Sequence, residues 1–296
     1  MNKKFSQQQL ELKADNIRQD ILRMLEHAGS GHSAGPLGMA DIFTALYFDD
    51  LLQYNPKKPD WPQRDRLVLS NGHINPVLYV TMAHAGYFDR TELKTLRQFG
   101  TRLQGHPERM RLPGIETTSG PLGSGISQAA GMAYGLLMDD QKKPHVYCLT
   151  SDAEHQEGNT WEAIMFAGNN RLRNLTVIVD RNNIQIDGYT EDVMPLEPLP
   201  AKYQAFNWHV IEIDGHNFEE IAGAVNQAKA IFERPTVIIA HTIAGKGVDF
   251  MENDYRWHGV PPGKQTIAGD PSPKQQIKVA LHELRTLQGK IRSEHE

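Results

Sequence analysis

Five short runs of consecutive apolar and β-branched residues recur along the chain, and stretches with helical spacing or long loops separate them. The runs are "RLVLS" (66–70), "HVYCLTS" (145–151), "LTVIVD" (175–180), "WHVIEID" (208–214) and "PTVIIAHT" (235–242). Continuous apolar runs of this length are typical of strands that are covered on both faces. Their alternation with helices predicts an α/β fold, in which a parallel sheet carries helices on both faces.

Helices are predicted where apolar residues recur at spacings of three and four. In the first such stretch Ile17, Ile21 and Leu25 share one face, and Gly29 follows as a stop signal. A chain of 296 residues is long enough to bury a large core, and either one large α/β domain or two smaller ones would fit this length. The expected helices cover 8–28, 39–48, 75–85, 91–98, 124–138, 157–171, 217–232 and 273–289.

Composition excludes several classes of function. The formal net charge of −5 and the lack of a basic run argue against binding to nucleic acid. The chain has no run of 18 uncharged apolar residues, and its first residues lack the apolar core of a secretory signal, so we expect no membrane association and a cytoplasmic location. The single cysteine, Cys148, lies inside an apolar run, which predicts a buried and unreactive thiol.

Three connections, at about 29–38, 99–123 and 243–272, are unusually long for a fold of this kind. Each contains glycines together with His, Leu or other large residues, whereas a flexible linker would lack large side chains. We therefore expect these loops to fold over a functional site.

An acidic cluster follows the second apolar run, in "SDAEHQEGNTWEA" (151–163). Asp152 stands just beyond the end of a predicted parallel strand, which is where open α/β sheets bind ligands. A helix that begins near Glu157 would favour an anion there, and a carboxylate beside an anion requires a cation between them. The alternative is that Asp152 or Glu154 only caps the helix.

The next strand supplies partners for Asp152. Asn182 and Asn183 follow it, about thirty residues after Asp152, at the same edge of the sheet. A carboxylate, an amide oxygen and a backbone carbonyl are hard oxygen ligands that suit Mg²⁺ and leave positions for phosphate oxygens. The spacing therefore predicts a site for a divalent metal and a phosphate group.

The segment "SDAEHQEG" followed by "NN" resembles the signature of enzymes that use thiamine diphosphate. Nearly the whole chain resembles the N-terminal, diphosphate-binding part of transketolase, which implies that part's α/β fold and a single domain over residues 1–296. The further matching segments are "GSGHSAGPLGMAD" (29–41), "RLVLSNGH" (66–73), "GHPE" (105–108), "TTSGPLGSGISQAAGMA" (117–133), "NNIQIDG" (182–188) and "TIAGKGVDFMENDYRWHG" (242–259).

The resemblance implies roles for individual residues. Asp152, Asn182 and the carbonyl of Ile184 would hold Mg²⁺ or Ca²⁺. The residues that would bind thiamine diphosphate are His73, Gly120, Leu122, Asp152, Ala153, Asn182, Ile184 and His258. The catalytic residues would be His32, His106 and His258, which face the sugar, and Glu157 and Glu162, which join a carboxylate network at the subunit interface.

Each of these residues also has a simpler interpretation. A histidine in a loop is usually exposed, but the selected ones lie in turns rich in Gly or Pro, where the backbone can approach a ligand. For Glu154 we expect a solvated helix face. Ser151 and Ala153 replace two glycines of the signature, and Ala153 would be strained if its φ angle were positive, which would weaken cofactor binding.

The pyrimidine-binding and C-terminal domains of transketolases have no counterpart in residues 1–296. The resemblance thus implies a split enzyme, in which a partner subunit with the pyrimidine-binding domain completes a heterotetramer. The pair would transfer a two-carbon ketol unit from a ketose phosphate to an aldose phosphate. The alternatives are a subunit of a 1-deoxyxylulose-5-phosphate synthase-like or dihydroxyacetone synthase-like enzyme, or a regulatory subunit without cofactor. A dehydrogenase is disfavoured, because "GPLGSG" does not fit the dinucleotide fingerprint.

Overall fold

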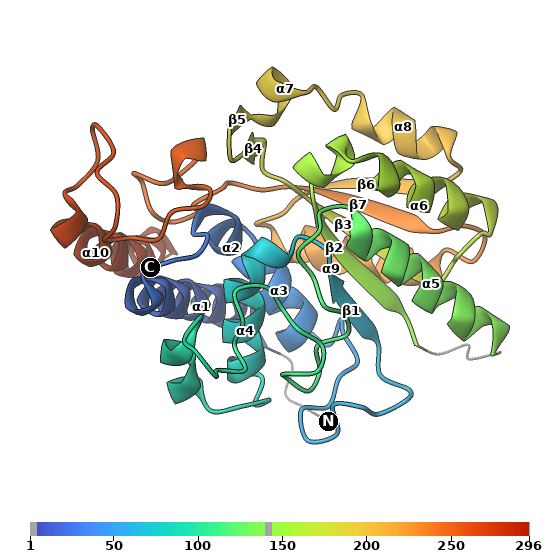
Figure 1. Cartoon of the computed structure of the whole chain (residues 1–296), viewed down its shortest axis with the longest axis horizontal. Helices are drawn as coiled ribbons and strands as arrows, with labels where there is room; N and C mark the ends of the chain where they lie inside the picture. Colours follow the sequence, from blue (N-terminus) through green and yellow to red (C-terminus); the bar gives the residue numbers. More distant parts are fainter. Residues whose placement is uncertain (1–4, 140–143, 296) are drawn as a thin grey trace.

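Five parallel strands form the centre of the molecule (Figure 1). The computed structural model describes residues 5–139 and 144–295. All five predicted strands are confirmed to within one residue at each end. In the order in which they lie side by side, they are β1 (Arg66–Leu69), β2 (Val146–Ser151), β3 (Leu175–Arg181), β7 (Thr236–His241) and β6 (His209–Asp214).

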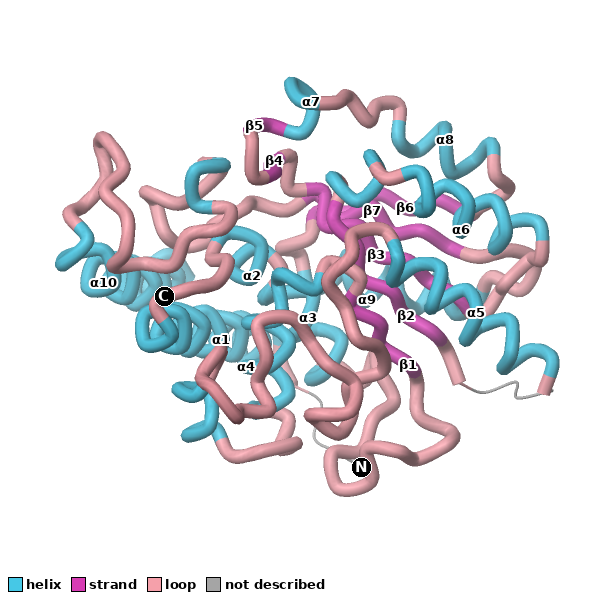
Figure 2. The backbone as a smooth tube through the Cα atoms, in the orientation of Figure 1, coloured by secondary structure: helices cyan, strands magenta, loops and turns pink. Residues whose placement is uncertain are grey.

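Both faces of this sheet are buried. On β3, Ile178 packs into one apolar cluster, while its neighbours Val177 and Val179 pack into the other. The first cluster contains side chains of α1, α3, α4, α9 and α10, and the second those of α5, α6 and α8. Figure 2 shows the strands between these two groups of helices, so the predicted architecture is confirmed. Cys148 is buried in the second cluster, as predicted.

Most of the predicted helices are present. α1 starts with a capping box between Ser6 and Gln9 and ends at Gly29, which adopts the left-handed conformation. The prediction at 91–98 is wrong in type, because a 3₁₀ turn, η2 (Arg90–Thr95), ends before Arg97 with its positive φ of 61°. The longer helices are α1 (Gln7–Ala28), α3 (Ala40–Phe48), α4 (Asn75–His84), α5 (Ser124–Met138), α6 (Gly158–Asn169), α9 (Phe218–Ala230) and α10 (Pro273–His295).

Several short elements were not predicted, because a helix of one or two turns or a strand of two residues carries too few positions to show a period. They are the helices α2 (Ala34–Gly38), α7 (Thr190–Val193) and α8 (Leu199–Ala205), the hairpin of β4 (Ile184–Gln185) and β5 (Gly188–Tyr189), and the 3₁₀ turns η1 (Gly72–Ile74), η3 (Ala153–Gln156) and η4 (Tyr255–Trp257). Among the described helices none is long and apolar enough to cross a membrane.

The first and third of the long loops are linked to each other. The Ser33 hydroxyl donates to the carbonyl of Val260 at 2.6 Å, and the Gly245 N–H donates to the carbonyl of Ala34 at 2.9 Å. Because the strands are parallel, β1, β2, β3 and β7 all end at one edge of the sheet. The residues that follow these strands form the crevice described next.

Candidate active site

Three histidines from three separate segments meet in this crevice. The ring centroids lie 4.9 Å apart for His32 and His73, 5.3 Å for His32 and His258, and 5.2 Å for His73 and His258. Burial lowers the pKa of His32 to about 3 and that of His258 to about 4, and it holds the pKa of His73 well below the ordinary value. All three rings are therefore neutral at neutral pH.

Two of these rings have nitrogens available for a ligand. Nδ1 of His32 and Nδ1 of His258 are buried and have no hydrogen-bond partner. Buried polar atoms without partners are rare in proteins, and an absent ligand is one reason for them. A Cβ on Gly259 would lie 3.5 Å from Nε2 of His32 and 4.0 Å from Cδ1 of Ile186, so the β4–β5 hairpin reaches the histidine rings.

His106 lies at the exposed side of this group. Its ring atoms would lie 3.9–4.0 Å from a Cβ built on Gly120, so the two predicted site residues are neighbours. Partial burial, together with the charge of Arg97, lowers the pKa of His106. Leu122, in the same loop as Gly120, keeps 39% of its surface exposed.

The glycines of "GPLGSG" allow helix α5 to approach the ends of β1 and β2. Gly123 has a φ of 76°, and a Cβ there would lie 2.3 Å from Oδ1 of Asn159. A Cβ on Gly125 would lie 2.4 Å from Cβ of Ser70. Side chains at either position would displace the loop that carries Gly120.

Glu154 is buried, so the prediction of a solvated helix face is wrong. Its exposed fraction is 0%, and its Oε1 accepts from the hydroxyl of Ser70 at 2.6 Å and the N–H of Gly123 at 2.7 Å. Oε2 accepts from the N–H of Ser151 at 2.8 Å. The carboxylate thus joins the ends of β1 and β2 to the start of α5. Burial raises its pKa, although these hydrogen bonds lower it.

Asp152 is fully buried at the end of β2. Its Oδ1 accepts from the N–H of Ala153 at 2.7 Å, and its Oδ2 accepts from the N–H of Asn183 at 2.8 Å. Arg181 also donates to Oδ2, at 2.9 Å. Burial raises the pKa of Asp152, while the positive charge of Arg181 opposes this shift. The structure therefore brings Asp152 and the Asn182–Asn183 turn together, as the spacing predicted.

Asn182 is oriented by a residue of its own strand. Its Nδ2 donates to Oδ2 of Asp180 at 2.8 Å, and its Oδ1 accepts from the N–H of Ile184 at 3.1 Å. The hydroxyl of Thr242 donates to Asp180, and burial raises the pKa of Asp180 to about 7. Asn183 has a φ of 63°, which allows the tight turn between Asn182 and Ile184.

These donors fit a divalent metal that arrives with its own oxygen ligands. Among the described residues no group of three or more His, Cys, Asp or Glu could hold a metal ion. Asp152 could offer one carboxylate oxygen to such an ion, and Asn182 and Ile184 could offer neutral oxygens. A hard cation at this set would complete its coordination with phosphate oxygens and water.

Comparison with known proteins decides the family. Residues 10–276 match the model of the thiamine diphosphate binding domain of transketolase. The chain belongs to the transketolase family. This confirms the resemblance, and it confirms thiamine diphosphate as the cofactor of the family.

Two relatives of similar length are named as parts of transketolases. The chain is 45% identical over 258 residues to the 6-deoxy-6-sulfo-D-fructose transketolase subunit SqwG of Clostridium sp., a match that covers 86% of this chain and 93% of that one. It is 40% identical over 259 residues to one of the subunits of the apulose-4-phosphate transketolase of Phocaeicola vulgatus, over 86% and 90% of the two chains. The prediction of a transketolase subunit, and thus of a transferase, is confirmed.

A solved transketolase has the same fold. The transketolase from Leishmania mexicana superposes with a TM-score of 0.82 at 32% identity, over 96% of this chain. The chain spans 45% of the length of that transketolase. The prediction that residues 1–296 form a single domain extends beyond the described residues and stays a prediction.

Ala153 does not have the strain that we expected in this transketolase subunit. It begins the 3₁₀ turn η3 and is not among the residues with a positive φ. Its N–H donates to Asp152. The condition for strain, a positive φ, is therefore not met, and backbone strain at Ala153 gives no reason for weaker cofactor binding.

Glu157 and Glu162 lie on an exposed surface, away from the histidine rings. Among the described residues neither carboxylate has a hydrogen-bond or ion-pair partner. Turn η3 lies between Asp152 and α6, which begins at Gly158, one residue after the predicted start at Glu157. A carboxylate network of Glu157 and Glu162 stays a prediction. The large exposed apolar residues of α5 and α6 are Tyr134, Met138, Met165 and Phe166.

Two residues at the crevice were missed by the sequence analysis. Both side-chain polar atoms of Asn71 are buried without partners, and Asn71 stands between the end of β1 and His73. Arg97, with its positive φ, lies close enough to lower the pKa of both His32 and His106. Asn71 was not selected because, in the segment "SNGH", the titratable histidine is the more obvious candidate. Arg97 was not selected because its neighbours in sequence form no recognisable motif.

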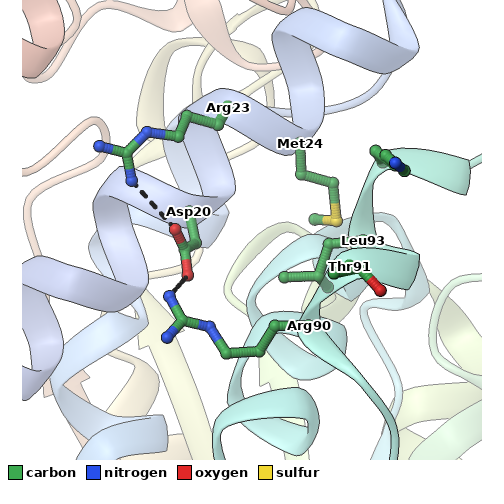
Figure 3. Close-up of a pocket in the computed structure, with 7 residues that line it drawn as sticks. Asp20, Arg23, Met24, Arg90, Thr91 and Leu93 are labelled. Carbon is green, nitrogen blue, oxygen red and sulfur yellow. Dashed lines mark hydrogen bonds and ion pairs between the residues drawn. The ribbon is translucent and has the colours of Figure 1, made fainter.

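A separate pocket between α1 and η2 is not a competing site. Figure 3 shows Asp20 between Arg23 and Arg90, with Met24 and Leu93 beside them. Arg23 and Arg90 form ion pairs with Asp20 at 3.0 and 2.5 Å, and His84 contacts the same carboxylate at 2.9 Å. The carboxylate of Asp20 is thus already paired with side chains of the chain itself.

Proposed function

We propose that the chain is the diphosphate-binding subunit of a two-subunit transketolase that uses thiamine diphosphate and Mg²⁺ or Ca²⁺. The observation that carries this proposal is the meeting of His32, His73 and His258 at the edge of the sheet where Asp152 and the Asn182–Ile184 turn lie. Neutral buried imidazoles beside hard oxygen donors match the needs of a magnesium diphosphate.

We assign the predicted residues as follows. Asp152, Asn182 and the carbonyl of Ile184 hold the metal, and His73 and His258 donate to diphosphate oxygens. The loop at Gly120 and Leu122 borders the pyrimidine ring, and the backbone at Ala153 lies beside the phosphates. Buried Nδ1 atoms without partners on His32 and His258 support a ligand at this place.

Thiamine diphosphate, when bound, supplies the electron sink for breaking and forming carbon–carbon bonds. The chain itself supplies the histidine nitrogens that donate hydrogen bonds and accept protons. His32, His106 and His258 have lowered pKa values, so each ring is neutral at neutral pH, with one nitrogen that can donate a hydrogen bond and one that can accept a proton. We assign them to the carbonyl and hydroxyl groups of the sugar.

We propose that a partner subunit with the pyrimidine-binding domain covers the exposed face of α5 and α6. Glu157 and Glu162 lie on α6 or just before it, and they would join the partner's carboxylates in a proton-sharing network. Two copies of each subunit would form a heterotetramer. The two relatives that are named as subunits support a partner chain. We expect this complex in the cytoplasm.

The donor would be a ketose phosphate and the acceptor an aldose phosphate. The names of the two relatives contain a sulfonated sugar and a sugar phosphate, both of which are anionic. The guanidinium of Arg97, at the rim with His106, supplies a positive charge that suits such substrates.

The test combines binding with turnover. The chain and its partner are purified separately, and ketol transfer is measured for each alone and for the mixture, with a ketose phosphate or pyruvate as donor. We expect transfer from the ketose phosphate by the mixture alone. Full activity of the single chain would contradict the proposal, and preference for pyruvate would favour the synthase-like alternative.

Matched variants assign the activity to the crevice. His258→Asn should lower the transfer rate about 100-fold or more, because it removes a proton carrier next to the substrate. His241→Asn is the control, since His241 is exposed at the end of β7 and pairs with Glu212 at 3.2 Å. Equal rates for the two variants would refute the assignment.

A further inference from the structure

Arg181 is the last residue of β3, and its guanidinium lies among three carboxylates. Nη1 donates to Oδ2 of Asp152 at 2.9 Å, and Nη2 donates to Glu191 at 2.6 Å and to Glu197 at 3.0 Å. The Arg181 side chain is 4% exposed and that of Asp152 is 0% exposed. A buried cation thus stands directly beside the carboxylate that we assign to the metal.

The two oxygens of Asp152 differ in what they can still accept. Oδ2 accepts from Arg181 and from the N–H of Asn183, and the hydroxyl of Thr190 lies 3.4 Å away. Within the part of the chain that the structure describes, Oδ1 accepts only from the N–H of Ala153, at 2.7 Å. Because a carboxylate oxygen has two lone-pair sites, Oδ2 is filled and Oδ1 keeps one site.

The position of the guanidinium does not depend on Asp152 alone. Glu191 accepts from the N–H of Leu196 at 3.1 Å, and Glu197 accepts from the N–H of Leu199 at 2.8 Å. These backbone bonds fix the two outer carboxylates, and the planar guanidinium contacts all three acids at once. A lysine ammonium is a point charge and would not reproduce this geometry.

Arg181 therefore orients Asp152, one of the assigned metal ligands, just as Asp180 orients Asn182, the other side-chain ligand. Successive residues of a strand point to opposite sides. Asp180 contacts Asn182 and Arg181 contacts Asp152, so the end of β3 holds both side-chain ligands. Residues that orient metal ligands in this way commonly change metal affinity 10–100-fold when they are replaced.

We propose that Arg181 is a positioning residue for the metal: it occupies Oδ2 of Asp152 and leaves Oδ1 for the divalent cation. This inference rests on the proposed function. It implies that Arg181 stays hydrogen-bonded to Asp152 when the metal is bound, and that the metal does not displace the guanidinium.

The experiment measures binding of Mg²⁺ with thiamine diphosphate to the complex of the full chain and its partner subunit by calorimetry, and it measures thermal unfolding of the metal-free chain. We expect Arg181→Met to weaken the binding about 10-fold or more, and Arg181→Lys to weaken it less. The melting temperature of the metal-free chain should fall in Arg181→Met, because Asp152 loses its counter-charge.

The control is Arg64→Met. Arg64 contacts Glu116 at 2.8 and 2.9 Å and is also largely buried, but it precedes β1 at the opposite end of the sheet. We expect a lower melting temperature and unchanged binding. If Arg64→Met weakens binding as much as Arg181→Met does, the effect is general destabilisation and the proposal is overturned.

The remaining outcomes are also decisive. Unchanged or tighter binding by Arg181→Met would mean that Arg181 competes with the metal, which overturns the proposal. If the wild-type complex does not bind Mg²⁺ with thiamine diphosphate, the metal site of the proposed function fails instead. Should Arg181→Met not fold, the double variant Glu191→Gln and Glu197→Gln, which frees only the outer side of the guanidinium, must weaken binding measurably.

Discussion

Glu154→Gln should destabilise the chain by about 2–3 kcal/mol, although the change removes only a charge. The carboxylate is a pure acceptor for Ser70, Gly123 and Ser151. An amide places an NH₂ group at one of the two oxygen positions, so at least one buried N–H or O–H faces another donor. An unsatisfied buried donor costs about 1–3 kcal/mol, and the remaining bonds lose their charge assistance.

Urea unfolding at neutral pH measures this difference. Glu157→Gln is the matched control, because Glu157 lies three residues further on and is exposed, and its free energy of unfolding should change by less than about 0.5 kcal/mol. A Glu154→Gln variant as stable as this control would refute the network. Both variants keep the volume of the side chain, so cavity formation does not enter the comparison.

The pH dependence supplies a second check. Burial raises the pKa of Glu154 above its ordinary 4.5, so the folded chain holds this proton more tightly than the unfolded chain. The contribution of Glu154 to stability is therefore greatest below pH 4.5 and decreases as the pH rises through the raised value. We expect the difference between wild type and Glu154→Gln to decrease with rising pH in that window.

Three further predictions concern the crevice. In Asp180→Asn the new amide can donate a hydrogen bond to Asn182, and the side-chain amide of Asn182 would then rotate. Mg²⁺ with thiamine diphosphate should therefore bind about 10-fold more weakly, as measured by calorimetry. Equal affinity would contradict the orienting role of Asp180. Gly125→Ala places a Cβ 2.4 Å from Cβ of Ser70, so the free energy of unfolding in urea should fall by about 1–3 kcal/mol. Burial lowers the pKa of His258 from 6.5 to about 4, so wild-type stability should fall as the pH falls through this range. His258→Asn should reduce that slope by about one proton, ~1.4 kcal/mol per pH unit, in unfolding measured at several pH values.

The architecture could be predicted because the sheet is buried on both faces. Continuous apolar runs mark such strands, and residues such as Val177 and Ile178 face opposite apolar clusters. Short elements such as α2 and the β4–β5 hairpin could not be predicted. They are too short to show a periodic pattern of apolar residues, and contacts with the rest of the fold stabilise them. The 3₁₀ turn η2 has the sequence pattern of a short helix, because three or four apolar positions do not separate the two.

The proximity of Asp152 to the Asn182–Asn183 turn could be predicted, because parallel strands bring their carboxyl ends to one edge of the sheet. The burial of Glu154 could not be predicted in the same way. Local sequence places it in an acidic, polar segment, and only Ser70 and Gly123, which are distant in sequence, show why it is buried. The same holds for Arg181, whose partners come from a segment without regular spacing.

The crevice contains two kinds of buried polar group. Groups of the first kind form hydrogen bonds within the chain, and groups of the second kind have atoms without a partner. Both carboxylate oxygens of Glu154 and of Asp180 accept hydrogen bonds from other groups of the chain, so these residues stabilise the folded loops without a ligand. Asn71, His32 and His258 instead keep buried atoms without partners, each of which costs the free chain about 1–3 kcal/mol. A ligand that supplies these partners offsets that cost on binding. Ligand binding should therefore stabilise this chain through the second group, while substitutions in the first group should lower its stability whether or not the ligand is present.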